Sequence, residues 1–321
     1  MQGKVHADAM SAVYVGIDVS KERLDVYLHP LDERMAIVND AGGWRRLRRR
    51  LEALAPALVV MEATSKYHRA VHRRLDAGAI PVAVVNPLRA RLFAEARGRL
   101  GKTDAIDARM LALMAEQLAP RPTAPLSAEA EAVQELARAR ACAVAEKTAV
   151  GQRRDVAATA FLRRELAARL ASLERHIARL EAEIDRIAAA DADMARRKAV
   201  LLSIPGIGPV TAITLIADLG ELGRLSDKQV ASIAGLAPHP KDSGACQGQR
   251  RTGGGRSGLR SALYMAAVAA IRANPDLKAF HRRLIDNGKP FKVAITAVMR
   301  KLLILANSLI AQNRTWTPTA P

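Results

Sequence analysis

The sequence predicts an α/β domain followed by a mainly helical region. Short β-branched runs mixed with helical segments fill roughly the first 120 of the 321 residues. A proline-rich break at Pro120, Pro122 and Pro125 precedes two long alanine-rich helical stretches. A glycine-containing turn then opens an apolar helix within residues 203–220. At about 150 residues per domain, the length corresponds to roughly two domains.

The order of elements follows from hydrophobic periodicity in the first domain. Residues 13–17 and 24–28 predict two strands, and the short connection VSKER between them predicts a β-hairpin. A helix carrying five arginines follows at about residue 45, and another is expected over residues 64–76. The remaining pattern is helical from residue 87 to 113, interrupted at Gly98 and Gly101. Further strands are expected at residues 35–38, 58–61 and 81–85.

A leucine and isoleucine seam runs through the second alanine-rich stretch. Its members are spaced alternately by four and three residues, as in the a and d positions of about three heptads. Two interpretations remain equally open, a helix packed on a partner helix of its own chain and a coiled coil between chains. The seam consists of Leu166, Leu170, Leu173, Ile177, Leu180, Ile184 and Ile187.

The charge of the chain points to a polyanionic partner. The net charge is +18, and residues 239–321 hold 14 Lys or Arg against three acidic residues. Aromatic residues make up only 3% of the chain, so we expect contacts mainly to backbone phosphates and to duplex shape. Two cysteines are too few for a disulfide framework, which favours a reducing, cytoplasmic location. The first twelve residues lack a signal-peptide core, and no uncharged apolar run reaches about 18 residues, so we expect no membrane.

Four carboxylates are candidates for a metal site. Asp18 ends the first strand and Glu62 ends a buried strand, while Asp104 and Asp107 lie three apart on a predicted helix. Carboxylates that converge in a basic protein need cations between them, and hard oxygen ligands suit Mg²⁺ or Mn²⁺. Taken singly, each is more often a turn residue or a solvated acid. Together they predict a metal site for phosphodiester chemistry.

Two glycines mark a candidate site for a nucleic-acid backbone. Gly206 and Gly208 lie in Pro205-Gly206-Ile207-Gly208, directly before an apolar helix. Backbone N–H groups and the helix dipole can attract a phosphate there, as in helix-hairpin-helix elements. The alternative is a plain turn between two helices.

A glycine-rich loop at residues 241–260 carries candidate nucleophiles and arginines. Ser243, Cys246, Thr252 and Ser257 can act as nucleophiles, but the sequence supplies no obvious base to activate them. The alternative is a basic surface loop. Its arginines can bind a phosphate and stabilise developing charge; they are Arg250, Arg251, Arg256 and Arg260.

The ordered motifs resemble a known family. GIDVSKERLDV, MEAT, VNP and KTDAIDARMLA resemble the N-terminal half of the DEDD transposases of bacterial insertion sequences, relatives of the Piv-type invertases. IPGIG, AGLAP, DSG and LRSALYMAA resemble the C-terminal half of that family, so the match spans about residues 13–309. After the serine, this chain is shorter than the family pattern, which leaves the alignment of the arginines unsettled.

The resemblance implies a specific architecture and chemistry. It implies a RuvC-like, ribonuclease-H-type first domain whose four carboxylates bind Mg²⁺, and a catalytic serine at Ser243. That serine attacks a DNA phosphate and forms a phosphoserine link. A structured guide RNA from the element, and a dimer or tetramer at the DNA synapse, are further implications.

We therefore predict a site-specific DNA recombinase of an insertion sequence. One alternative is a RuvC-like junction nuclease that forms no covalent intermediate, and another is a non-catalytic, basic DNA-binding protein. An actin-like phosphotransferase is disfavoured, because the N-terminal half has no second glycine-rich phosphate loop. The expected segments are a tail at 1–12, the RuvC-like domain at 13–125, a helical coiled-coil segment at 126–195, the transposase domain at 196–315 and a tail at 316–321.

Overall fold

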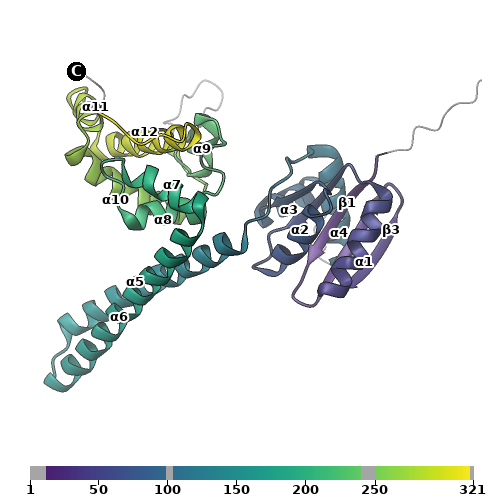
Figure 1. Cartoon of the computed structure of the whole chain (residues 1–321), viewed down its shortest axis with the longest axis horizontal. Coiled ribbons are helices and arrows are strands. Elements are labelled where there is room, and N and C mark those ends of the chain that lie inside the picture. Colours follow the sequence, from purple (N-terminus) through teal and green to yellow (C-terminus); the bar gives the residue numbers. More distant parts are fainter. Residues whose placement is uncertain (1–11, 99–103, 240–250, 319–321) are drawn as a thin grey trace, which may run out of the picture. The chain divides into compact units, whose positions relative to one another are not determined.

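The computed structural model describes residues 12–98, 104–239 and 251–318, without the side chains of residues 104–106, 239 and 257. The chain divides into two compact units, residues 1–126 and 127–321 (Figure 1). Each unit has its own hydrophobic core.

Unit 1 is built on a five-stranded mixed sheet. The strand order is β3-β2-β1-β4-β5, in which β1, β2 and β3 pair antiparallel, and β1, β4 and β5 pair parallel. This small mixed sheet is compatible with a DEDD nuclease-like fold. The elements of unit 1 are β1 (Tyr14–Val19), β2 (Arg23–His29), β3 (Glu33–Val38), α1 (Ala41–Leu54), β4 (Leu58–Glu62), α2 (Tyr67–Asp76), β5 (Val82–Val85), α3 (Pro87–Ala96) and α4 (Asp104–Leu118).

The two faces of this sheet pack against different helices. Alternate residues of β1, namely Val15, Ile17 and Val19, join α1 and α2 in one core cluster. Tyr14 on the other face packs in a second cluster with Leu111 and neighbouring residues of α4. Because side chains alternate along a strand, the face of each remaining residue of β1 and β4 is fixed by this division.

Residues 120–125 follow the edge of the sheet beside β5. The N–H of Thr123 donates to the carbonyl of Val82 at 2.8 Å, and the N–H of Val84 donates to the Thr123 hydroxyl at 3.0 Å. The ring nitrogen Nε2 of His72 on α2 lies 2.8 Å from the carbonyl oxygen of Thr123. These hydrogen bonds of Thr123 attach the proline-rich segment to unit 1.

Unit 2 is almost entirely helical in its described residues. Its first two helices lie side by side as a long hairpin in Figure 1. In its described residues, the β-structure is a short two-stranded ladder formed by β6 and β7. The elements are α5 (Ala128–Val156), α6 (Ala160–Ala190), α7 (Ala192–Leu202), α8 (Pro209–Asp218), α9 (Asp227–Ile233), β6 (Pro238–His239), β7 (Arg251–Thr252), α10 (Ser257–Ala273), α11 (Pro275–Asp286) and α12 (Phe291–Ala311).

The leucine seam faces a helix of the same chain. Leu173 and Ile184 of α6 are buried although the structure holds a single chain, and α5 and α6 pack along their lengths. Ion pairs cross the antiparallel hairpin, including Arg140 with Glu181 at 2.7 Å and Lys147 with Glu174 at 2.8 Å. Of the two interpretations left open, packing on a partner helix of the same chain is therefore observed. Pairing between chains stays a prediction.

The helix α12 forms the centre of the second core. It is the one helix in the described residues that is long and apolar enough to cross a membrane. Its buried residues, among them Ile295, Val298 and Leu302, pack instead in a cluster with α7, α8 and α10. The composition of α12 is thus accounted for by a protein interior.

Candidate functional site

Asp18 and Glu62 lie next to each other at the carboxyl ends of two neighbouring strands. β1 and β4 pair in parallel, with Gly16 opposite Val60 and Ile17 opposite Met61. Continued by one residue, this register brings Asp18 level with Glu62 at the same edge of the sheet. Both residues are partly buried. A parallel register thus sets two carboxylates side by side on one face.

That face is the one covered by α4. Asp18 shares the alternation of Tyr14 and Gly16, and Glu62 shares that of Leu58 and Val60, which pack against α4. Gly16 approaches α4 so closely that a Cβ there would overlap the backbone of Ala108 and Ala112. The missing side chain of Gly16 therefore lets the helix lie directly on the strand.

The direction of α4 brings its first turn toward the two carboxylates. Tyr14 packs near Met114, whereas Gly16 lies at Ala108 and Ala112, so the helix runs opposite to β1. Asp104 begins the helix four residues before Ala108, about 6 Å along its axis. Asp18 lies two residues beyond Gly16, about 7 Å along the strand. From the contact at Gly16, the start of α4 and the end of β1 therefore extend in the same direction by similar distances, toward one corner of unit 1.

We call Asp18, Glu62, Asp104 and Asp107 the acidic tetrad. Its members are all carboxylates, the hard oxygen donors that Mg²⁺ and Mn²⁺ take in proteins, so the donor chemistry fits a divalent cation. Among the described side chains, which do not include that of Asp104, no group of three His, Cys, Asp or Glu is arranged to hold a metal ion. Strand register and the direction of α4 thus lead Asp18, Glu62 and the start of α4 toward one corner, and the metal site remains a prediction.

Tyr27 fixes α4 from the neighbouring strand. Its side chain is 3% exposed and packs against Ala108 and Ala112. Its hydroxyl donates to the Asp32 carboxylate at 2.8 Å. Burial raises the pKa of Tyr27, and the hydrogen bond to Asp32 raises it further. The guanidinium of Arg109 lies 5.8 Å from the ring centre, and its charge opposes this rise in pKa without reversing it.

The predicted nucleophile belongs to a segment between two paired strands. Ser243, Cys246 and Arg250 lie outside the residues that the structure describes. On either side of this segment, Pro238 pairs with Thr252 and His239 pairs with Arg251. The ladder of β6 and β7 therefore closes the base of the serine-bearing segment.

A close backbone approach of glycines supports this ladder. Gly235, Gly254 and Gly255 have φ angles of +67°, +67° and +65°, in the left-handed region that favours glycine. A Cβ on Gly235 would overlap the carbonyl of Gly254, and one on Gly255 would overlap the backbone of Gly235. We call the ladder of β6 and β7, together with these three glycines, the loop stem.

Two of the predicted phosphate-binding arginines are already bound within unit 2, at or next to the loop stem. The guanidinium of Arg256 donates to the carbonyl of Asp218 and to the Glu221 carboxylate at 2.9 Å. The guanidinium of Arg260 donates to the carbonyl of Gly254. Arg251 is exposed on β7 and has no ion pair within the described parts of the chain. Of the predicted phosphate-binding arginines that the structure describes, Arg251 is thus the most available for an external phosphate.

The pKa values of the two carboxylates near Arg256 are shifted in opposite directions. Burial raises the pKa of Asp218, although the charges of Arg138 and Arg256 oppose the shift. Burial also acts to raise the pKa of Glu221, but the hydrogen bond and charge of Arg256 outweigh it and lower that pKa. Glu221 is therefore the charged partner of Arg256.

The two glycines of the helix-hairpin-helix motif occupy different environments. Gly206 has φ +105°, and a Cβ there would lie 2.6 Å from Cα of Ala270 on α10. Its requirement for glycine is explained by packing within unit 2. Gly208 is exposed, has open space around it and precedes α8 without a side-chain cap. Only Gly208 therefore presents backbone to solvent as a phosphate site requires.

Comparison with known families matches both halves of the chain. A transposase profile of the DEDD type found in IS110 elements matches residues 15–161. The transposase profile of the IS116/IS110/IS902 family matches residues 198–282. The first range includes the acidic tetrad, and the second includes Ser243 and the loop stem. The chain belongs to the DEDD transposases of insertion sequences.

The curated relatives agree with this assignment over nearly full length. The pilin gene-inverting proteins of Moraxella bovis and Moraxella lacunata are each 28% identical to this transposase over 319 residues, which is 95% of this chain and 98% of the relative. A probable family 20 transposase of Pseudomonas aeruginosa is 27% identical over 356 residues, 96% of this chain and all of the relative. This DEDD transposase is accordingly a DNA transposase and recombinase enzyme.

Several residues that organise the site were missed by sequence reasoning. Gly16 sits inside a strand pattern, a signal that often marks a close backbone approach, and could have been found on that ground. Gly235 and Gly255 gave no comparable signal, because their partners lie about 20 residues away in the sequence. Gly235 and Gly255 lie in motifs that the sequence analysis names, but their mutual approach is visible only in the structure.

Proposed function

We propose that this transposase is a site-specific recombinase that cuts and rejoins DNA with the acidic tetrad and a serine nucleophile, Ser243. The observation that carries the proposal is the corner of unit 1. The register of β1 and β4 sets Asp18 level with Glu62, and Gly16 allows the first turn of α4 to approach both. A ribonuclease-H-type arrangement of unit 1 is part of the proposal.

The acidic tetrad would hold Mg²⁺ or Mn²⁺. When bound, such an ion supplies positive charge that neutralises a phosphodiester and stabilises its transition state. The chain's own contribution is to hold four carboxylates on rigid elements, so their positions depend on strand register and helix packing. Without a cation, their mutual repulsion opposes this arrangement.

The serine step is a transesterification. The hydroxyl oxygen of Ser243 forms a bond to phosphorus, and the bond from phosphorus to one deoxyribose oxygen breaks. The serine proton ends on that leaving oxygen, which becomes a free hydroxyl at the cut strand. One ester replaces another, so the reverse step can rejoin strands without an external energy source.

Nucleic-acid recognition is proposed to rest on the basic C-terminal region. Arg251 and the exposed Gly208 are the described candidates for phosphate contacts, with Arg250 beyond the described residues. Base pairing by an element-encoded guide RNA would supply sequence choice, and a dimer or tetramer would align the four strands. Few aromatic residues and many arginines fit such a division of labour.

Trapping a covalent protein–DNA adduct tests the proposal. The protein is incubated with Mg²⁺, the DNA that flanks its gene and RNA transcribed from that flank, and adducts are resolved by denaturing electrophoresis. We expect an adduct with the native chain and none with Ser243→Ala. Ser257→Ala is the matched control, because it removes another serine hydroxyl from the same glycine-rich region and should retain the adduct.

Two other outcomes would replace this proposal. Cleavage without an adduct, unchanged in Ser243→Ala, would indicate a metal-dependent junction nuclease. DNA binding without metal-dependent turnover, unaltered by Asp104→Asn, would indicate a non-catalytic DNA-binding protein.

A further inference from the structure

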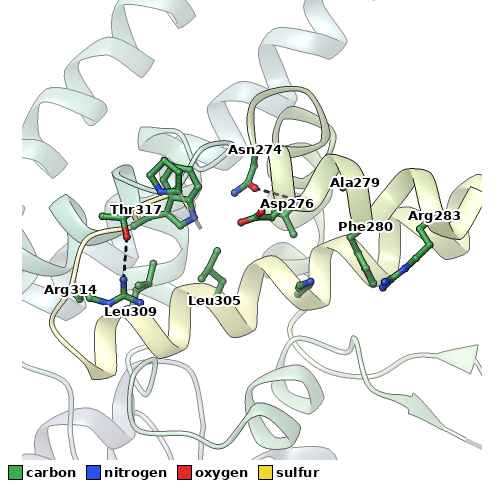
Figure 2. A pocket seen from close by; sticks show the side chains of 13 residues that line it. Asn274, Asp276, Ala279, Phe280, Arg283, Leu305, Leu309, Arg314 and Thr317 are labelled. Carbon is green, nitrogen blue, oxygen red and sulfur yellow. Dashed lines mark hydrogen bonds between the residues drawn. The ribbon is translucent and has the colours of Figure 1, made fainter. Parts of the chain in front are cut away.

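A cavity of about 770 Å³ opens in unit 2 between α11, α12 and the segment at residues 314–318 (Figure 2). Its volume lies within the range of about 300–1,000 Å³ that is common for small-molecule sites. The side chains that matter here are Asn274, Phe280, Arg283, Lys301, Arg314 and Trp316. None of them belongs to the acidic tetrad, the loop stem or the serine-bearing segment.

Asn274 provides a buried donor at this cavity. Its side chain is 1% exposed, and its Oδ1 accepts the N–H of Leu277 at 3.2 Å, which caps α11. Its Nδ2 has no hydrogen-bond partner within the described residues. Buried amide groups in proteins are usually satisfied. An acceptor carried by a ligand in the cavity would satisfy this one.

Three cations surround the same space. Arg283 comes from α11, Lys301 from α12 and Arg314 from the segment after α12, while Asp276 is the one acidic residue among the described lining. In the described parts of the chain, none of the three cations forms an ion pair. With three cations and one carboxylate, the cavity lining carries a net positive charge, which suits an anionic ligand.

Two aromatic residues line the cavity, and the ring of Phe280 lies beside two of the cations. Nζ of Lys301 lies 4.7 Å from the ring centre of Phe280, and the Arg283 guanidinium lies 5.5 Å from it. Trp316 is held in place because its backbone N–H donates to the hydroxyl of Ser203 at 2.8 Å. Flat aromatic surfaces combined with cations are the features that bind a stacked base and its phosphate.

We propose that this cavity binds one unpaired nucleotide of a nucleic-acid strand. The base stacks on the indole of Trp316, Nδ2 of Asn274 donates to an acceptor on the base edge, and the phosphate lies among Arg283, Lys301 and Arg314. The inference rests on the proposed function only in taking nucleic acid as the partner. The unpaired nucleotide can come from DNA or from RNA, since both supply a base and a phosphate.

Fluorescence of Trp316 reports on this binding directly. The chain has two tryptophans, so Trp44→Phe in unit 1 leaves Trp316 as the single emitter. The full-length protein is titrated without divalent metal against a duplex with one unpaired nucleotide and against the same duplex fully paired, in DNA and RNA forms. We expect quenching and roughly tenfold tighter binding for the duplex with the unpaired nucleotide. The arm with the larger effect identifies the strand.

Neighbouring arginines on α11 provide a matched control. Both Arg282 and Arg283 are exposed, but only Arg283 lines the cavity. Arg283→Gln should reduce the preference for the unpaired nucleotide severalfold, and Arg282→Gln should leave it unchanged. Asn274→Ser keeps a residue that caps helices well but removes the amide donor, so it should reduce the preference with little change in the melting temperature.

Three results would overturn the proposal. Equal affinity for both duplexes, with Trp316 unquenched, would exclude an unpaired nucleotide. Equal losses in Arg282→Gln and Arg283→Gln would show only general attraction to polyanions. Competition by polyglutamate as strong as that by the unpaired nucleotide would assign the cavity to acidic peptides. Because no strand is cut here, failure would leave the adduct assay of the proposed function unaffected.

Discussion

The corner of unit 1 and the loop stem of unit 2 hold their residues by different means. In unit 1, Asp18 and Glu62 extend from paired strands, and α4 lies directly on Gly16. In unit 2, the stem consists of two residue pairs and three glycines, beside arginines that are bound to backbone carbonyls. The corner is therefore set by regular secondary structure, whereas the stem depends on individual contacts. Substitutions should consequently act on chemistry in unit 1 and on local order in unit 2.

The largest expected effect comes from the acidic tetrad. Asp18→Asn keeps the size of the side chain but removes a charged oxygen ligand, so metal-dependent cleavage should fall by more than about a hundredfold. The melting temperature should not decrease, because one charge is lost from a group of like charges. Cleavage rates and circular-dichroism melting measure the two quantities. Retained cleavage would contradict a role for this corner.

Gly16→Ala tests the packing that creates the corner. A Cβ at Gly16 would overlap the backbone of Ala108, so α4 must shift, and the free energy of unfolding should fall by about 1–3 kcal/mol. Cleavage should fall as well. Gly151→Ala is the control, because Gly151 lies in α5 with open space around it and should gain up to about 1 kcal/mol. Chemical denaturation measures both; equal effects would refute the close approach.

Arg251 and Arg256 should differ in their contribution to DNA binding. Arg251 is exposed without an ion pair in the described residues, whereas Arg256 is paired with Glu221. Arg251→Gln should make the slope of log K against log salt shallower by about 0.9. Arg256→Gln should change that slope clearly less. Salt titrations with duplex DNA measure this difference, and identical slopes would show that pairing with Glu221 does not restrain Arg256.

The smallest expected effect is the pH dependence of that ion pair. The pKa of Glu221 in the folded protein lies below its usual value of 4.5, so the pair stabilises the fold above that pH. Stability is lost as the pH falls through the lowered pKa. Because the two side chains are 44% and 47% exposed, Arg256→Gln should cost less than about 1 kcal/mol at neutral pH. The cost should vanish once the pH lies below that lowered pKa, and a pH-independent cost would indicate that the carbonyl of Asp218 is the important partner.

Local structure could be predicted from the sequence to a large extent. The strands at residues 13–17, 24–28 and 58–61 lie within or beside β1, β2 and β4, because apolar alternation and β-branched runs act over a few residues. The interruption between residues 98 and 101 falls between α3 and α4 for a similar reason. In the candidate site, the residue types and their order were sufficient to select the acidic tetrad.

The partners of side chains could not be predicted in the same way. Arg256 looked like a phosphate ligand because a guanidinium suits phosphates and carboxylates alike. Its observed partner is the Glu221 carboxylate, which lies 35 positions away in the sequence. Asn274 was likewise missed, because its burial and its unpaired amide arise only when α11, α12 and the last segment pack together.

By itself, the sequence determined which segments are helices and strands, how positive the C-terminal region is and which acids are candidates for a metal. These properties depend on composition and on periodicities of two to four residues. Only the tertiary structure decided that α4 packs directly on Gly16 and that the seam of α6 packs on α5. It also decided that Arg256 pairs with Glu221 and that Arg260 binds the carbonyl of Gly254. Those outcomes depend on contacts between distant residues, whose strength is set by packing and burial rather than by local pattern.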